Sequence, residues 1–76
     1  MKEILELIIT NLVDNKEEVS IEETVADNNI DYKVKVSKDD MGKVIGKQGR
    51  VARSIRTVMK SVSAKEGKKV NIEFVD

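Results

Sequence analysis

The sequence contains no cysteine, histidine, tryptophan or proline, and these absences exclude several classes of protein and site. Without cysteine the chain has neither a disulfide framework nor thiolate ligands for zinc, which favours an intracellular setting. Without histidine as well, the usual nucleophiles, bases and metal ligands of enzymes are missing, so we expect no catalysis, no cofactor and no metal. The longest apolar run, residues 4–13, is too short and too polar to span a membrane. We expect a soluble cytoplasmic protein with no membrane partner.

Aromatic residues are also scarce. The 76 residues include one tyrosine and one phenylalanine, and both lie in alternating patterns that predict strands with these two side chains directed inward. A chain of this length forms one domain, residues 1–76, near the lower limit at which a single apolar core stabilises a fold.

Net charge is zero overall but is divided along the chain. Residues 1–40 contain five lysines and eleven acidic residues, a net charge of −6, whereas residues 41–76 contain nine basic and three acidic residues, a net charge of +6. A polyanion is attracted by the second part and repelled by the first, so the sequence predicts oriented binding of modest affinity.

Hydrophobic periodicity predicts six elements in the order helix, strand, strand, helix, helix, strand. Apolar residues at helical spacing from Met1 to about Asp14 predict a first helix that packs against the core. Period-two patterns predict strands at residues 19–25 and 32–36, joined by a turn at 26–29 into an antiparallel hairpin, and a third strand at 70–74.

Two signals delimit the remaining helices. Ser37 followed by Asp40 resembles a capping box and predicts a short helix over residues 38–45, and Gly67 predicts the C-terminal end of a long helix that extends to the residue before it. Gly42 lies inside the short helix. It is either a mild defect or a point at which another backbone approaches closely.

A Gly-Lys-Gln-Gly corner at residues 46–49 joins these two helices. Glycine tolerates positive φ and has no Cβ, so a pair of glycines permits a sharp reversal and a close approach of another backbone. The first N–H groups of the following helix have no intrahelical partner and lie at the positive end of its dipole, which favours an anion such as phosphate. Lys47, Arg50 and Arg53 add positive charge at the same place.

The long helix separates apolar from basic residues. Its apolar arc consists of Val51, Ala52, Ile55, Val58, Met59 and Val62, and its basic arc consists of Arg50, Arg53, Arg56 and Lys60. The basic arc is either an ordinary solvated face or, beside the glycine corner, a stripe that binds a polyanion. Val58, Met59 and Val62 exceed what a small sheet needs, so they are candidates for a dimerisation surface, with ordinary core packing as the alternative.

Residues 44–49, reading VIGKQG, resemble the I-G-x-x-G signature of the K-homology (KH) domain family, in which a GxxG loop between two helices clamps the backbone of about four nucleotides. The run from Asp40 to Arg56 and the ending GKKVNIEFVD extend the likeness, to small bacterial single-KH proteins, over essentially the whole chain. The resemblance implies an α+β fold of the type II KH class, with order αββααβ, a three-stranded mixed sheet and three helices on one face.

The resemblance also implies a site and partners. The residues that would bind the backbone of single-stranded RNA or line its groove are Lys43, Val44, Ile45, Gly46, Lys47, Gln48, Gly49, Arg50 and Arg53. The protein would act in RNA chaperoning or post-transcriptional regulation. It would form a homodimer and pair with a larger RNA-binding protein that also carries a KH domain.

Two other functions are alternatives to RNA binding. Nucleotide hydrolysis is disfavoured because the glycines fit neither GxxxxGK[ST] nor GxGxxG. A protein-interaction module that keeps the KH fold and acts mainly through dimerisation with a KH-containing partner is the remaining alternative. Because aromatic stacking platforms are scarce, we expect any RNA binding to be weak, salt-sensitive and broadly tolerant of sequence.

Overall fold

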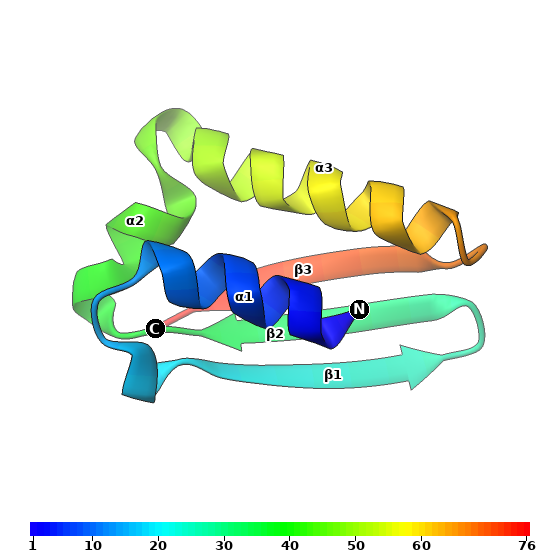
Figure 1. Ribbon diagram of the computed structural model, residues 1–76, viewed down its shortest axis with the longest axis horizontal. Coiled ribbons are helices and arrows are strands. Elements are labelled where there is room, and N and C mark those ends of the chain that lie inside the picture. The colour runs from blue at the N-terminus through cyan, green and yellow to red at the C-terminus, as the bar shows by residue number, and fades with distance from the viewer.

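A three-stranded sheet forms one layer of the structure, a computed structural model that describes residues 1–76 (Figure 1). The central strand β2 (Asn29–Lys35) pairs antiparallel with β1 (Ser20–Ala26) and parallel with β3 (Lys69–Val75). The sheet is therefore mixed. The α+β class, the order αββααβ and the three-stranded mixed sheet predicted above are confirmed.

Three helices form the other layer, all on the same face of the sheet. They are α1 (Lys2–Leu12), α2 (Met41–Ile45) and α3 (Arg50–Ala64). Figure 1 shows α1 crossing in front of the sheet and α3 running along β3. None of these helices has the length and hydropathy that a membrane span requires.

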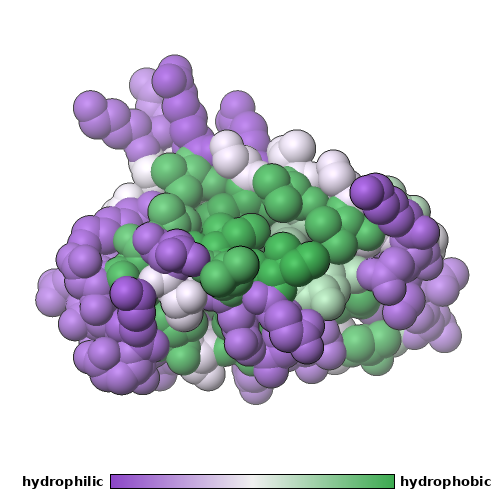
Figure 2. Space-filling view, viewed as in Figure 1, coloured by the Kyte–Doolittle hydropathy of each residue, from purple (hydrophilic) through white to green (hydrophobic).

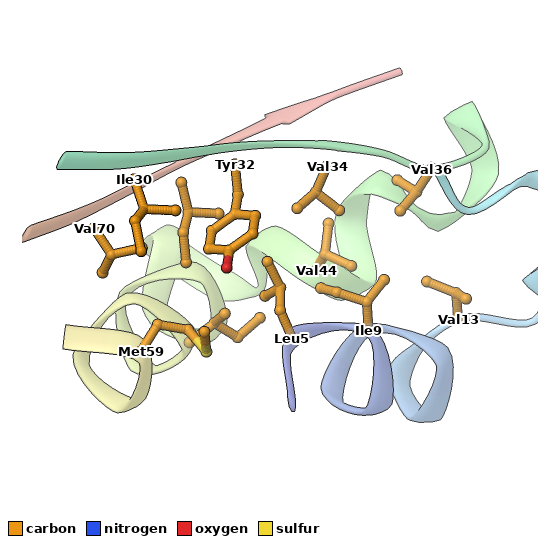
Figure 3. Close-up of a cluster of buried hydrophobic side chains, with 12 residues drawn as sticks. Leu5, Ile9, Val13, Ile30, Tyr32, Val34, Val36, Val44, Met59 and Val70 are labelled. Atoms are coloured by element: carbon orange, nitrogen blue, oxygen red, sulfur yellow. The ribbon is translucent and has the colours of Figure 1, made fainter. Parts of the chain in front are cut away.

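The core lies between the two layers. The strands contribute one side of it, because buried and exposed side chains alternate along them. On β2 the side chains of Ile30, Tyr32 and Val34 are buried while their neighbours are exposed, because successive side chains of a strand point to opposite faces. Figure 3 shows these residues meeting Leu5 and Ile9 of α1. The buried cluster consists of Leu5, Ile9, Val13, Ile30, Tyr32, Val34, Val36, Val44, Ile55, Met59, Val70 and Ile72.

Four large residues of the predicted apolar faces are exposed instead, namely Ile4, Leu7, Val25 and Val58. Ile4 lies at the edge of the packed face of α1, outside the line of Leu5 and Ile9 that contacts the strands. Val25 is 55% exposed because β1 is an outer strand that the helices only partly cover. The prediction of a strand at residues 19–25 is thus correct, but the apolar side chains of this strand are less buried than the alternating pattern predicted.

The boundaries of the helices differ from the prediction in two places. The short helix begins as a 3-10 turn (Lys38–Asp40) before α2, and α3 ends at Ala64, two residues early. Gly67 does adopt a left-handed conformation, with φ of 69°. The N–H of Lys68 donates to the carbonyl of Ser63 and that of Gly67 to the carbonyl of Ala64, the two bonds of a Schellman motif.

Candidate nucleic-acid interface

The corner at residues 46–49 is a tight turn with an unusual backbone. Gly46 has φ 75° and ψ 177°, a region open essentially only to glycine, and Gly49 is left-handed with φ 74° and ψ 15°. Gln48 also has positive φ, 56°, which is uncommon for a residue with a side chain. The two glycines are therefore required by the backbone path, as the sequence predicted.

The two glycines differ in what surrounds them. A Cβ on Gly46 would lie 2.9 Å from the backbone nitrogen of Val51 and would overlap that side chain, so Gly46 packs directly against the first turn of α3. A Cβ on Gly49 would have no neighbour within 4 Å. The side of the corner that carries Gly49 is thus open to solvent, while Gly46 anchors the corner to the helix.

The start of α3 is available to a ligand. Its N-cap residue is Gly49, and no side chain caps the first N–H groups. The hydroxyl of Ser54 donates to the carbonyl of Arg50 and does not compete for them. The N–H of Arg50 donates to the carbonyl of Lys47. Since α3 is a 15-residue helix, the positive end of its dipole favours an anion at this point.

Unpaired cations surround that point. Lys47, Arg50 and Arg53 are exposed, and no acidic side chain lies within ion-pair distance of them. Figure 2 shows long hydrophilic side chains projecting from the N-terminal half of α3. Gln48 is exposed as well. The structure therefore brings together the loop and the two arginines that the sequence singled out.

Lys43 has a different environment from the other candidates. Its ammonium pairs with the carboxylate of Asp14 and lies 3.6 Å from an oxygen of Asp40, and the hydrogen bond to Asp14 raises the pKa of Lys43. The side chain is 44% exposed beside the loop. Its charge is largely balanced within the protein, so it contributes less free positive charge than Lys47.

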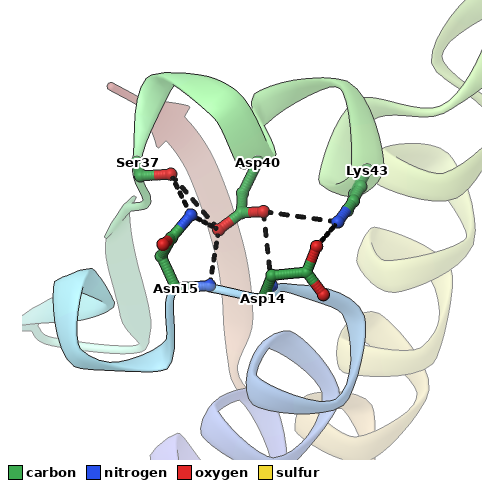
Figure 4. A network of polar contacts seen from close by, with 5 residues as sticks. All are labelled: Asp14, Asn15, Ser37, Asp40 and Lys43. Carbon is green, nitrogen blue, oxygen red and sulfur yellow. Dashed lines mark hydrogen bonds and ion pairs between the residues drawn. The ribbon is translucent and has the colours of Figure 1, made fainter.

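The carboxylate of Asp40, which is 1% exposed, organises a network that the sequence did not reveal (Figure 4). It accepts hydrogen bonds from the backbone N–H groups of Asn15 (3.0 Å) and Asp14 (3.3 Å), the Asn15 amide (3.1 Å) and the Ser37 hydroxyl (3.2 Å). Burial raises the pKa of Asp40, but the hydrogen bonds from Asn15, Asp14 and Ser37 outweigh it and lower that pKa to about 2.

This network corrects the predicted capping box. The hydroxyl of Ser37 donates to the Asp40 side chain and caps no backbone N–H, while the Asp40 carboxylate is directed at the end of α1. The network therefore ties the end of α1 to the start of α2, the five-residue helix that carries the loop. The local signals of this arrangement are Ser37, three residues before Asp40, and Lys43, three residues after it.

Gly42 is not required by the protein's own packing. It lies in α2, and a Cβ added there would meet nothing within 4 Å. Close approach by another part of this chain is excluded as its reason. The exposed position one turn before the loop leaves the helix surface open to a ligand that passes over it.

Arg56 belongs to the basic arc of the long helix but is not one of the predicted RNA-binding residues. Its Nε donates to the carbonyl of Ile72 (3.3 Å), and its guanidinium carbon lies 5.4 Å from the centre of the Phe74 ring. Both partners belong to β3. Thus Arg56, within the basic arc of α3, contacts β3, one of the two edge strands of the sheet.

The predicted dimerisation residues divide into different environments. Met59 is fully buried in the core, so it offers no surface, which corrects its candidacy. Val58 is 46% exposed and Val62 is partly buried. Val58 borders an open apolar groove of about 300 Å³ between α1 and α3, and Figure 2 shows this apolar area. The groove is lined by Ile8, Leu12, Val51, Ser54, Ile55 and Val58.

Comparison with known proteins gives consistent matches along the chain. A family model described as "KhpA/KhpB, KH domain" matches residues 2–74. The RNA-binding protein KhpA of Clostridium perfringens is 51% identical over 75 residues, 99% of this chain and 100% of the relative. The proteins of the same name from Listeria monocytogenes and Chlamydia trachomatis are each 45% identical over the whole of this chain, covering 100% and 97% of the relative.

Proposed function

The chain belongs to the KhpA/KhpB family of KH domains, and from this membership and the loop geometry we propose that it is a non-catalytic protein that binds single-stranded RNA at residues 46–49. The relatives carry the name of RNA-binding proteins. The observation that carries the proposal is an exposed corner between two positive-φ glycines that leads into the uncapped start of α3. The site serves RNA chaperoning or post-transcriptional regulation in the cytoplasm.

Each part of the corner has a role in this proposal. A phosphate lies at the positive end of the α3 dipole, and Gly49 presents no side chain that would hold the strand away. Lys47, Arg50 and Arg53 supply the long-range attraction. Lys43 acts chiefly by fixing α2 through its pair with Asp14, and secondarily as a groove residue.

The expected binding is weak and depends on salt. For single-stranded nucleic acids, a plot of the logarithm of the binding constant against the logarithm of the salt concentration has a slope of about −0.7 per neutralised phosphate. Three cations that each neutralise one phosphate therefore predict a slope of about −2. Contacts to phosphate and sugar fix the position of a strand without reading its bases. We therefore assign broad sequence tolerance to this site.

A double substitution in the corner tests the proposal. Lys47→Asp with Gln48→Asp places two carboxylates where phosphate binds and leaves the core intact, so filter binding to a short oligouridylate should fall at least tenfold. Lys16→Asp with Asn11→Asp changes the net charge by the same amount at exposed positions on or near α1 and is the matched control. Equal loss in both variants, or no loss in the first while it remains folded, would contradict the assignment.

Self-association is a second candidate function, favoured by the apolar groove between α1 and α3. We propose that a second copy of the chain occupies it. In a two-fold arrangement α1 of one copy meets α3 of the other, so that the apolar residues lining the groove are covered in both copies. The same face would accept a larger KH-containing partner, the heteromer that the family resemblance implied.

Sedimentation at tens of micromolar tests this second proposal. The wild type should sediment as a dimer and Val58→Asp as a monomer, because the substitution places a charge in the covered groove. Val25→Asp is the matched control, since Val25 is similarly exposed but lies on β1, away from the groove. A monomeric wild type, or a dimer that tolerates Val58→Asp, would remove the proposal.

A further inference from the structure

The strand β1 forms an open edge of the sheet, on the margin opposite to β3 and α3 (Figure 1). It pairs only with β2, over seven residues in continuous register, and it contains neither a proline nor a bulge. An exposed strand edge of this length is a template on which a further strand can pair through its backbone. Proteins commonly shorten, kink or cover such an edge, and β1 has none of these modifications.

The hydrogen-bonding pattern identifies which backbone groups of β1 are free. Just before and just after β2, the carbonyl of Asn28 and the N–H of Val36 bind β3. Alternate residues of a strand direct these groups to opposite sides, so the odd-numbered residues of β2 bind β1. Their partners are the even-numbered residues of β1. The N–H and carbonyl groups of Ile21, Glu23 and Val25 therefore point away from the sheet, and no bond outside the sheet engages them.

The side chains of the same three residues lie on the face of the sheet that carries the helices. Glu23 accepts a hydrogen bond of 2.7 Å from the hydroxyl of Tyr32, and Ile21 packs against the core. Beside Ile21 a hollow of about 200 Å³ opens between α1 and β1, and it is lined by Glu6, Thr10, Lys16, Val19 and Ile21. A strand paired with β1 would direct a side chain into this hollow, because residues opposite Ile21 share its face.

Charge determines which strand the edge accepts. Residues 1–26, which include α1 and β1, contain two lysines and seven acidic residues, a net charge of −5. Glu6 and Glu23 are in no ion pair, and Lys16 is the one cation that lines the hollow. A second copy of β1 would bring acidic residues together, and a nucleic acid would be repelled. A basic side chain fits instead, since its aliphatic stem covers Ile21 while its charge reaches Glu6.

We propose that β1 binds an extended segment of a partner protein that carries lysine or arginine at alternate positions, and that the segment joins the sheet as a fourth strand. Backbone hydrogen bonds to Ile21, Glu23 and Val25 hold the segment, and its basic side chains contact Glu23 and Glu6. The charge that opposes self-pairing of the edge thereby selects the partner. This surface is independent of the loop at residues 46–49.

Hydrogen exchange of individual N–H groups, followed by NMR on the full chain, tests the proposal. The probe is a capped seven-residue peptide of alternating threonine and arginine. At saturation it should slow exchange of the N–H groups of Ile21, Glu23 and Val25 by roughly tenfold or more, because these groups acquire partners. The N–H groups of Glu22 and Thr24 already bind β2, so their exchange should change by no more than about twofold.

Two control peptides separate backbone pairing from charge. The same sequence N-methylated at every residue keeps the charge but has no backbone donor, so it should bind roughly tenfold more weakly by fluorescence anisotropy. A peptide with glutamate in place of arginine should not bind. The Lys47→Asp and Gln48→Asp double variant should bind the arginine peptide as the wild type does, since the loop takes no part.

Matched variants of the protein locate the charge. Glu6→Gln with Glu23→Gln should weaken binding of the arginine peptide roughly three- to tenfold, and the new amide at position 23 can still accept the hydrogen bond from Tyr32. Asp39→Asn with Glu73→Gln removes the same charge at exposed positions away from β1 and should leave the affinity almost unchanged. Urea unfolding checks that both variants are folded.

Each contrary result overturns a stated part of the proposal. Equal protection of odd- and even-numbered residues of β1, or equally tight binding of the methylated peptide, would overturn strand addition. Equal weakening in the two charge variants would overturn selection by Glu6 and Glu23. Loss of peptide binding in the loop variant would place the peptide at the loop and overturn the assignment to β1. Absence of binding by the folded wild type would overturn the proposal as a whole.

Discussion

Substitution of Gly46 by alanine is the most direct test of how the loop is built. The backbone at φ 75° and ψ 177° costs an alanine about 1–3 kcal/mol. The new Cβ would also lie 2.9 Å from the nitrogen of Val51, a backbone atom that cannot rotate away, and such overpacking costs about 1–3 kcal/mol. We therefore expect a loss of about 2–6 kcal/mol in the free energy of unfolding.

That loss is large for a protein of this size. At about 0.05–0.15 kcal/mol per residue, a chain of 76 residues has a total stability of roughly 4–11 kcal/mol. With a urea dependence of about 1 kcal/mol per molar, the unfolding midpoint of Gly46→Ala should fall by about 2 M or more. Equilibrium urea unfolding followed by circular dichroism measures it.

Gly49→Ala is the matched control. Gly49 has nearly the same φ, 74°, but a Cβ there meets nothing within 4 Å, so only the left-handed backbone cost of about 1–2 kcal/mol applies. A Gly46→Ala variant no less stable than Gly49→Ala would refute the close packing of Gly46 on α3.

Three further predictions concern the surroundings of the loop and the core. Gly42→Ala should raise the unfolding free energy by about 0.5–1 kcal/mol in urea, because Gly42 is helical and nothing obstructs a Cβ, and should weaken RNA binding if a strand passes over it. Because the pKa of Asp40 falls from 3.8 to about 2 on folding, its stabilisation is present above about pH 4 and is lost as the pH falls towards 2; an acid titration of Asp40→Asn should lack this step. Burial and the hydrogen bond to Glu23 raise the pKa of Tyr32, so its contribution is present below pH 10 and is lost as the pH rises beyond it; Tyr32→Phe should unfold with a smaller alkaline dependence.

Local patterns predicted the elements of the fold well because periodicity reports which face of an element is apolar. It does not report how far the opposite layer extends. Ile4 and Val25 fit their apolar faces and are nevertheless exposed, since the cover provided by the other layer stops short of them. The corner was predictable from its two glycines, whereas the positive φ of Gln48 was not, because residues with side chains seldom adopt it.

The site was predicted where its residues are adjacent in sequence and missed where they are distant. Asp40 is 25 residues from Asn15, and Lys43 is 29 residues from Asp14. No local pattern indicates such pairs. The local pattern places Asp40 only in a capping box with Ser37. The buried structural role of Asp40 depends on a tertiary contact with the end of α1.

The two unlike flanks of α3 have a consequence for regulation. An apolar partner on the α1 side of α3 and a nucleic acid on its β3 side would contact opposite flanks of the helix. Neither would therefore exclude the other. A dimer would then carry two RNA-binding surfaces at a high effective concentration. Avidity would strengthen RNA binding that is weak in each copy alone. Substitutions such as Val58→Asp and Lys47→Asp should therefore alter assembly and RNA affinity separately.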